Sequence, residues 1–503
     1  MTTTWIDRPL RKHEVFIAFL TLAVIYAFPI IHADYLFIDD QWRSLMLFDD
    51  AWVGMGRYFS EGLYHVLTLT PSMPNIFPLP LLLSLLAICA AMTNLVFYFY
   101  SEVNIAKCLV VLPLLCNPFF LGNLSYQYDG PTMVCSVAAM ATVVTLQFTE
   151  TRLAYIVPPL FIVLGLGFYQ PSLSILTGLV CLEFLLKIAR GSPPAQLRST
   201  AVRRAAQLIL GVAAYYFTVY ALAHNDRDTL VPWDQHWIPT VGTRLWATLG
   251  KIGLLITPGT GWLCAVLTAL ASTGALILVR RPLTRSTSEA TKVGILLVIA
   301  ALVPVLVVVV PGMLLILAEE NHLDARQLMG FSISLILLFG LARTTLAILH
   351  PRAPLFLVIP CLYMFSLSYM YGQILNTKKD YETSLSNHIG YDLTSYPQLR
   401  DIREYGLIAS SSVKSDWLPD SAGVLRLTPL MDYLLTDGNY PLPPTRFARL
   451  GISNVYWASA SMQASLAEDK GLLVVDNLRY RIYKVGDKGI IQLRHLSNNL
   501  LPW

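Results

Sequence analysis

The sequence predicts a polytopic α-helical membrane protein that ends in a small α/β domain. Of its 503 residues, 55% are hydrophobic and only 14% are charged, whereas soluble domains carry roughly 25% charged residues. Apolar stretches of about 20 residues, the length that crosses a bilayer, recur through the first three quarters of the chain. After Asn376 the composition changes, and the tail holds 27 of the 68 charged side chains. The net charge of +4 adds little, because membrane proteins distribute basic residues by topology.

Eleven segments are candidate membrane spans. The third and the fifth are short and contain prolines, which are tolerated where neighbouring helices cover the freed backbone groups. We expect the first to remain as an anchor, because it is too long for a signal-peptide core and lacks a small-residue cleavage site. The spans lie near residues 14–32, 77–100, 107–122, 131–148, 153–169, 171–189, 205–223, 257–279, 293–317, 328–348 and 354–373.

The distribution of Lys and Arg places the N-terminus inside, since sixteen fall in inner segments and six in the short outer loops. An odd number of spans then places the tail outside. We assign the inner arginines from Arg198 to Arg204 to topology alone and expect their neutralisation to be tolerated. The inner residues are Arg8, Arg11, Lys12, Lys107, Arg152, Lys187, Arg190, Arg198, Arg203, Arg204, Arg280, Arg281, Arg285, Lys292, Arg343 and Arg352. The outer residues are Arg43, Arg57, Arg227, Arg244, Lys251 and Arg326.

Two domains are therefore expected, a membrane domain over residues 1–375 and an outer α/β domain over 376–503. Residues 378–405 are predicted to continue the last span as a helix. Residues 471–485 predict two strands around an Asp476-Asn477 turn. All seven cysteines lie singly within apolar spans, so we expect neither a disulfide framework nor a zinc site.

The first outer loop carries an acidic pair, Asp39-Asp40, flanked by Asp34 and Arg43. Carboxylates at a bilayer surface are costly and are usually retained for function. The pair is therefore a candidate catalytic base. A structural alternative stays open, in which one aspartate is the N-cap of a helix over residues 41–48.

The rest of this loop, about residues 49–68, predicts one helix lying in the interface plane. Arg57 and Glu61 are also explained as a surface ion pair at i, i+4. The apolar face would carry Trp52, Met55, Phe59, Leu63 and Val66, and the polar face Arg57, Glu61 and His65.

Three further outer segments are rich in Tyr, Gln, Asn and acids, which topology does not require. Asp129 is alternatively a cap of the fourth span, with Pro131 in its first turn. Tyr169-Gln170 is alternatively an aromatic-belt turn, and residues 319–326 a solvated ion-pair cluster. The candidate substrate-binding residues of the outer loops are Asp34, Arg43, Arg57, Tyr126, Gln127, Asp129, Tyr169, Gln170, Glu319, His322 and Arg326.

These residue types suit the transfer of a sugar from a polyprenyl phosphate. A carboxylate acts as general base on the attacking hydroxyl, a role typically worth 10²–10⁴-fold. Arginine forks hold the leaving phosphate, and Tyr, Gln and Asn suit sugar hydroxyls. A single displacement inverts the anomeric carbon and needs one base. A divalent metal is possible but not favoured, and no cofactor is expected.

Other enzyme classes have no motif in this chain. It contains no Gly-rich phosphate loop, HExxH or GxSxG motif, so nucleotide hydrolysis, zinc proteolysis and serine hydrolase chemistry are unsupported. No nucleic-acid partner is expected.

The chain resembles the bacterial O-antigen glucosyltransferases of the Gtr serotype-conversion type, members of the GT-C superfamily of polytopic glycosyltransferases. The resemblance covers the membrane domain and extends to its length and span order. It rests on Asp34-Tyr-Leu-Phe-Ile-Asp-Asp-Gln-Trp-Arg43, Asn117-Pro-Phe-Phe-Leu-Gly-Asn-Leu-Ser-Tyr-Gln-Tyr-Asp129, Tyr169-Gln-Pro-Ser172 and Ala325-Arg-Gln-Leu-Met-Gly330.

The resemblance implies a GT-C-like helical bundle in the bacterial inner membrane, with the active site and the C-terminal domain in the periplasm. Asp39-Asp40 would supply the base, with Asp39 slightly favoured, and Asp129 would belong to the site. The donor would be undecaprenyl-phosphate-linked glucose, made and flipped by a partner synthase and flippase. The acceptor would be a lipid-linked O-antigen, the glycan part of lipopolysaccharide, or a related surface polysaccharide.

Two alternatives remain. The enzyme would transfer another lipid-phosphate-linked sugar to lipid A or another envelope glycan, or the protein would be a flippase or transporter of the lipid-linked sugar. Transporters tend to show inverted repeats and midplane ionisable residues. Here no repeat is visible, and the ionisable residues cluster at the outer mouth, which favours a transferase.

Overall fold

Long apolar stretches become helices because a backbone in hydrocarbon must satisfy its polar groups within the segment. The computed structural model describes residues 8–46, 51–222, 231–285, 289–313, 323–408, 418, 421–435, 442–469 and 471–494. The chain divides into two compact units. The first comprises residues 1–31 and 46–369, and the second comprises residues 32–45 and 370–503. The sequence placed the whole first loop in the membrane domain, whereas residues 32–45 group with the C-terminal residues.

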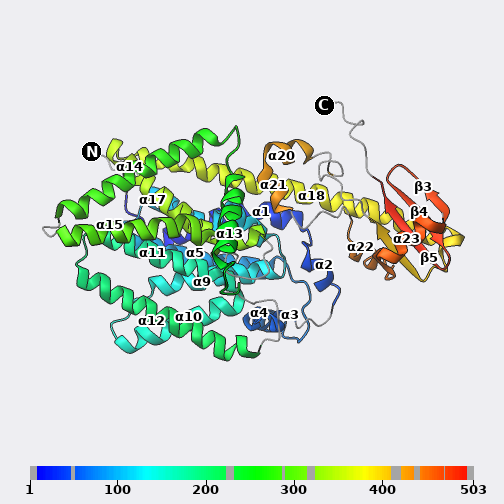
Figure 1. Cartoon of the computed structure of the whole chain (residues 1–503), viewed down its shortest axis with the longest axis horizontal. Coiled ribbons are helices and arrows are strands. Elements are labelled where there is room, and N and C mark those ends of the chain that lie inside the picture. The colour runs from blue at the N-terminus through cyan, green and yellow to red at the C-terminus, as the bar shows by residue number, and fades with distance from the viewer. Residues whose placement is uncertain are drawn as a thin grey trace. The chain divides into compact units, whose positions relative to one another are not determined.

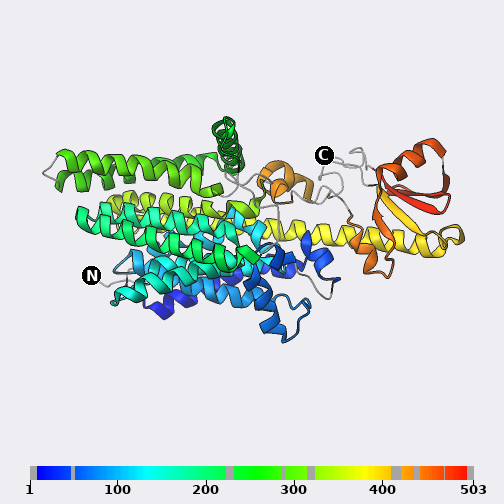
Figure 2. The same ribbon diagram turned by 60° about the horizontal axis from the view of Figure 1, so that its bottom comes forward.

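Most of the first unit is a set of helices lying side by side, with α13 running across them (Figures 1 and 2). The longer helices are α1 (Lys12–Ala33), α5 (Leu79–Phe99), α9 (Asp129–Thr145), α10 (Thr151–Phe168), α11 (Leu173–Ala189), α12 (Pro194–Thr218), α13 (Trp237–Gly253), α14 (Gly261–Arg285), α15 (Glu289–Pro304), α17 (Phe331–Leu349) and α18 (Val358–Ser395). The α18 helix continues into the second unit.

Within the described residues, nine helices are long and apolar enough to cross a membrane. They coincide with nine of the eleven predicted spans. The other two predicted spans, near 131–148 and 205–223, fall on α9 and α12, which do not meet these criteria of length and composition. The α9 helix has only 17 residues. The α12 helix has 25, but its first half is rich in Arg, Gln and Ser. The architecture is that of a polytopic membrane protein, and the count of eleven spans remains a prediction.

The α9 helix lies at the centre of this bundle, and nearly all of its residues are buried. It packs against α5, α10 and α11. Elsewhere in the first unit, α14 packs closely against α17. Gly274 makes this approach possible, because a Cβ there would lie 2.1 Å from the carbonyl oxygen of Leu341.

The predicted interfacial helix over 49–68 is two helices, α3 (Ala51–Gly54) and α4 (Tyr58–Thr68). They are separated at Gly56, whose φ of +70° is disfavoured for other residues. The break rotates the two halves, so the predicted common apolar face does not form. Trp52 is buried, whereas Val66 is 71% exposed, and the buried face of α4 carries Ser60 and Tyr64.

Short elements connect the long helices of the first unit. They are α6 (Ile105–Val111), α7 (Pro113–Cys116), η1 (Pro118–Phe120), α8 (Leu121–Leu124), η2 (Gln170–Ser172), η3 (Tyr220–Leu222), η5 (Val305–Val309), η6 (Val310–Gly312), η7 (Ala325–Gly330) and η8 (Ala353–Leu357).

The second unit contains a five-stranded mixed sheet in the order β2-β1-β5-β4-β3. Strand β1 is parallel to β2 and β5, and β3-β4-β5 is antiparallel. The two strands predicted around Asp476-Asn477 are β3 and β4. The strands are β1 (Glu404–Ile408), β2 (Val455–Trp457), β3 (Leu472–Asp476), β4 (Tyr480–Val485) and β5 (Lys488–Leu493).

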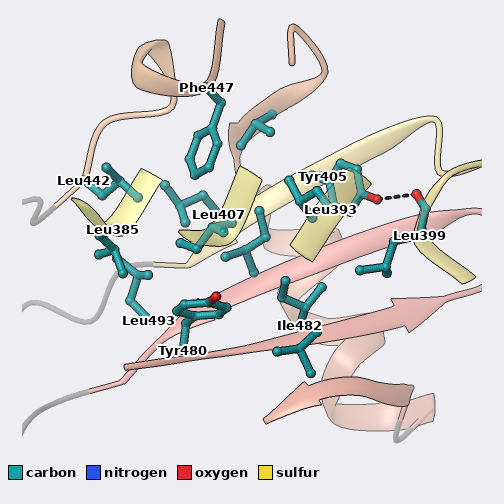
Figure 3. Packing of buried hydrophobic residues seen from close by; sticks show 14 of the residues in the cluster. Leu385, Leu393, Leu399, Tyr405, Leu407, Leu442, Phe447, Tyr480, Ile482 and Leu493 are labelled. Atoms are coloured by element: carbon teal, nitrogen blue, oxygen red, sulfur yellow. Dashed lines mark hydrogen bonds between the residues drawn. The ribbon is translucent and has the colours of Figure 1, made fainter. Parts of the chain in front are cut away.

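The core of this unit lies between the sheet and the end of α18 (Figure 3). Leu385, Ile389 and Leu393 from α18 pack against Tyr480 and Ile482 of the sheet. The predicted continuation of the last span is therefore a helix, but it ends at Ser395, before Pro397, rather than at Tyr405. The remaining helices of the unit are α2 (Asp39–Arg43), η9 (Pro397–Leu399), α20 (Ala422–Leu427), α21 (Pro429–Leu434), α22 (Thr445–Ala448) and α23 (Ala460–Asp469).

Candidate functional site

Asp129 is a buried carboxylate at the first residue of α9. The indole Nε1 of Trp52 donates a 2.6 Å hydrogen bond to Asp129 Oδ1, and Arg57 Nη1 lies 3.6 Å from the same oxygen. A charged group is stable in such a place only when it is paired and hydrogen-bonded. Pro131 lies in the first turn of α9, as predicted, but the Asp129 side chain is committed to Trp52 and Arg57.

Arg57 links the first outer loop to the turn between α10 and α11. Its Nε donates to Gln170 Oε1 at 3.3 Å, and its guanidinium lies 4.8 Å from the ring centroid of Tyr169. Gln170 in turn donates to the carbonyl of Met55 at 2.7 Å. The sequence proposed Arg57, Tyr169 and Gln170 as site residues from separate loops, and the structure brings the three together.

A second arginine is held by the segment before α17. Arg326 Nη1 donates to the hydroxyl of Tyr126 at 2.9 Å, and its guanidinium lies 5.1 Å from the Tyr126 ring. Asp324 forms an ion pair with it at 3.4 Å. The backbone is fixed as well, because Asn123 Nδ2 donates to the Arg326 carbonyl at 2.9 Å. Arg326 is partly exposed, which leaves its guanidinium reachable.

Tyr169 connects these two arginines electrostatically. Burial raises the pKa of the Tyr169 hydroxyl, while the positive charges of Arg326 and Arg57 lower it. The negative charges of Asp324 and Asp129 act in the opposite sense. Four charged side chains from three chain segments therefore act on one buried aromatic residue. We call Asp129, Arg57, Arg326, Tyr126, Tyr169 and Gln170 the arginine site.

Several supporting residues of the arginine site were not predicted. The Tyr64 hydroxyl donates to the carbonyl oxygens of Gln127 and Tyr128, each at 3.1 Å. Asn75 Nδ2 donates to Gln127 Oε1 at 2.7 Å. Trp52 was expected to face the membrane and instead holds Asp129. These contacts join positions more than fifty residues apart, so no local pattern signals them.

The Asp39-Asp40 pair lies in the second unit, in the short helix α2. Neither aspartate caps a helix over 41–48, because α2 begins at Asp39 itself and ends at Arg43. Asp40 is fully buried and its Oδ2 accepts a hydrogen bond from the Phe37 amide at 3.1 Å. Asp39 is half-buried. Of the two carboxylates, Asp39 is therefore the more accessible to a substrate.

The backbone before this pair is strained. Ile38 has a φ of +42°, a left-handed conformation that is a genuine outlier for a β-branched residue. Asp34 has a φ of +44°. Such strain persists where surrounding contacts impose it, and it clusters at functional sites. Arg43 is buried and lies over the Trp42 ring, with 5.1 Å between its guanidinium and the ring centroid.

Contacts from the C-terminal residues fix this loop within the second unit. Glu382 is fully buried and accepts a hydrogen bond from the Tyr35 hydroxyl at 2.8 Å. Arg446 donates to the other Glu382 oxygen at 2.7 Å. Gln41, next to Asp40, accepts from Thr445 Oγ1 at 2.9 Å. Asp34, a predicted substrate-binding residue, forms an ion pair with Lys379 at 3.3 Å.

Two predicted site residues, Glu319 and His322, lie outside the described residues. In the described part of the chain, no group of three or more His, Cys, Asp or Glu side chains could hold a metal ion.

The prediction that all of Arg198 to Arg204 serve topology alone is wrong for Arg204. Its side chain is buried and donates to Glu183 at 2.8 Å. It also donates to the carbonyl oxygens of Val143 and Val144 at 3.0 and 2.8 Å. Glu183 also forms an ion pair with Lys187, at 3.0 Å. Arg204 therefore ties α12 to α9 and α11 and is part of the packing.

The sequence profile described as Glucosyl transferase GtrII matches residues 28–339 of this chain. The matched stretch includes Asp39, Asp40 and the whole arginine site. An uncharacterized 55.3 kDa protein in the gtrB 5' region of Salmonella phage P22 is 27% identical over 207 residues. The alignment covers 41% of this chain and 42% of that protein, so it spans less than half of the relative's length. No solved structure matches the chain.

Proposed function

Because the chain belongs to the Glucosyl transferase GtrII family, we propose that it transfers glucose from undecaprenyl-phosphate-linked glucose to a hydroxyl of a lipid-linked O-antigen or related surface polysaccharide. The reaction takes place at the periplasmic face of the bacterial inner membrane and inverts the anomeric carbon. The family supports glucosyl transfer. The lipid-phosphate donor, the acceptor and the membrane face are our proposal.

One observation carries the proposed donor. Arg57 and Arg326 are both partly exposed, and the positive charges of both influence the Tyr169 hydroxyl. The buried carboxylate of Asp129 pairs with Arg57 and influences the same hydroxyl. Arginine offers a planar fork of donors that matches a phosphate, and aromatic rings beneath a guanidinium keep that fork oriented. In the proposed reaction these two guanidiniums hold the phosphate of the donor as it leaves. Tyr126 and Gln170 orient the guanidiniums and offer hydroxyl and amide groups to the sugar.

We assign the base to Asp39. Its carboxylate would accept the proton of the acceptor hydroxyl while that oxygen forms the new bond to the anomeric carbon and the bond to phosphate breaks. Asp40, whose oxygen holds the Phe37 amide, then serves to fix the loop. Asp129 is the alternative base, and its hydrogen bond to Trp52 and its proximity to Arg57 favour a structural role instead.

The test is transfer in nanodiscs, with undecaprenyl-phosphate-glucose as donor and a lipid-linked glycan as acceptor. Wild type is compared with Asp39→Asn, Asp40→Asn and Asp129→Asn, and with Asp487→Asn as a control at an exposed carboxylate of the second unit. We expect Asp39→Asn to abolish transfer without loss of folding, since the amide preserves shape. Full activity of both loop variants would move the base to Asp129 or Glu319.

A separate measurement tests the donor assignment. Arg326→Ala should raise the KM for the lipid-phosphate donor more than the KM for the acceptor, whereas equal losses would indicate a structural role. If wild type forms no product with any lipid-phosphate sugar but moves the donor between leaflets, the protein is a flippase and the proposal is wrong.

A further inference from the structure

A second cluster of positive charge lies at the other end of the helices that carry the arginine site. Arg326 lies in η7, the short helix that directly precedes α17, and Arg343 lies on α17, 17 positions after Arg326. At a rise of about 1.5 Å per residue, the two arginines are separated by about 25 Å along the helix axis. Likewise, Gln170 begins η2, which leads into α11, and Arg190 directly follows the last residue of α11. This distance approaches the thickness of the hydrocarbon core, about 30 Å.

Three cations surround Tyr100 at this end. The guanidinium of Arg343 lies 5.4 Å from the Tyr100 ring centroid, and Lys107 Nζ lies 5.6 Å from the same centroid. Arg190 donates to the carbonyl of the adjacent Phe99. Within the described residues, neither Lys107 nor Arg343 forms an ion pair with a carboxylate, and the buried Nε of Arg343 has no hydrogen-bond partner.

A mostly apolar cavity opens directly beside these cations. Its volume is about 320 Å³, and it is lined by aliphatic side chains of α11, α14, α15 and α17 together with Tyr100, Arg190 and Arg343. A second pocket of about 510 Å³ shares Phe99, Tyr100 and Arg190 with it and adds Ser101 and Lys107. Apolar walls with a few convergent polar groups are typical of ligand sites.

We propose that this cavity binds an anionic phospholipid of the leaflet opposite to the arginine site. An acyl chain occupies the apolar cavity, and the headgroup phosphate contacts Arg343, Arg190 and Lys107. The charge of the mouth selects an anionic lipid over a zwitterionic one, since basic residues near a membrane surface attract anionic lipid headgroups. The inference does not depend on the reaction that the protein catalyses.

The test is native mass spectrometry of the full chain in detergent, titrated with dioleoyl phosphatidylglycerol or dioleoyl phosphatidylcholine. Wild type should retain phosphatidylglycerol at concentrations at least tenfold lower than phosphatidylcholine. The double variant Arg190→Gln/Arg343→Gln should lose this preference. Arg152→Gln, at an exposed arginine at the start of α10, should keep it.

A second variant separates binding from folding. Gly340 lines the cavity, and a Cβ there would meet only Val110, at 3.7 Å, so Gly340→Leu fills the space without a clash at Cβ and keeps all three cations. It should block lipid retention. Equal retention of the two lipids by wild type, or retention unchanged in Gly340→Leu, would overturn the proposal. So would competition by inorganic phosphate, which would indicate an ion site, or binding of undecaprenyl phosphate but not phosphatidylglycerol.

Discussion

The indole of Trp52 donates a 2.6 Å hydrogen bond to the carboxylate of Asp129, 77 positions further along the chain. Both side chains are buried, and Tyr64 and Tyr128 stack beside them, with 5.6 Å between their ring centroids. This bond attaches the short helix α3 of the first outer loop to the start of α9. Asp129 is the one carboxylate among the contacts described for Arg57. The bond from Trp52 therefore also fixes the anion that faces Arg57.

Trp52→Phe tests this attachment, because it keeps an aromatic ring and removes the donor. Hydrogen bonds to charged groups contribute about 1.5–3 kcal/mol, so we expect a stability loss of about 2 kcal/mol. Transfer activity should fall as Asp129 and Arg57 lose their fixed geometry. Thermal unfolding and the transfer assay measure the two effects. Trp262→Phe is the matched control, since Trp262 is 61% exposed; equal effects at both positions would contradict the assigned role.

The sequence predicts the helices of the first unit well because each span is a local property. A run of about 20 apolar residues suffices, whatever its neighbours are. The prediction weakens where composition is mixed, as in the polar first half of α12. It also fails at the end of α18. Residues 404–405 were assigned to a helix, but they pair with Asn454 and with β5, which lie far away in the sequence.

The candidate site follows the same rule. Outer-loop composition indicated Arg57, Asp129, Tyr169, Gln170, Tyr126 and Arg326, because charge and amide content are visible locally. The side chains that hold these residues in place, and those that hold the loop with Asp39, come from distant parts of the chain and were not visible in the local sequence. Glu382 is 347 positions from Tyr35, and its burial depends on the folded second unit. Its one local signal is Lys378, four residues earlier on the helix, which lies 4.0 Å from it.

Glu382→Gln tests whether the C-terminal residues hold the loop that bears Asp39. The change leaves the buried Lys378 and the partly buried Arg446 facing a neutral amide. Removing one partner of a buried ion pair costs about 3–5 kcal/mol, so the second unit should be strongly destabilised. We expect faster proteolysis near residues 32–45 and loss of transfer.

The matched control for this variant is Glu404→Gln. Glu404 pairs with Lys488 at 3.9 Å on an exposed face, and such pairs contribute about 0–1 kcal/mol. Its stability and proteolysis should match wild type. If Glu382→Gln behaves in the same way, Glu382 does not anchor the loop.

Arg204→Gln tests the buried ion pair that Arg204, in the first half of α12, forms with Glu183. Glu183 would keep Lys187 and the Tyr98 hydroxyl but lose its closest guanidinium, and two carbonyl oxygens of α9 would lose their donor. We expect a destabilisation of about 3 kcal/mol with little change in the KM of either substrate. The exposed Arg198→Gln should leave thermal unfolding unchanged. Equal tolerance of both changes would restore a purely topological role for Arg204.

The buried hydroxyl of Tyr405 leads us to expect that the second unit loses stability at alkaline pH. Burial raises the pKa of its hydroxyl to about 12, and in its protonated form the hydroxyl donates to the carbonyl of Leu399 (Figure 3). A folded-state pKa above the unfolded value of about 10 stabilises the fold fully below pH 10. This contribution declines as the unfolded chain ionises and is lost as pH rises through about 12.

Thermal unfolding between pH 8 and 12 measures this decline. Tyr405→Phe should start from a lower stability, because the hydrogen bond is gone, and should lose less between pH 10 and 12 than wild type does. Tyr456→Phe on the neighbouring strand β2 is the control, since that ring is 55% exposed. Its pH profile should follow wild type, because Tyr456 does not belong to the core cluster of the second unit. Parallel profiles for wild type and Tyr405→Phe would assign the alkaline loss to other groups.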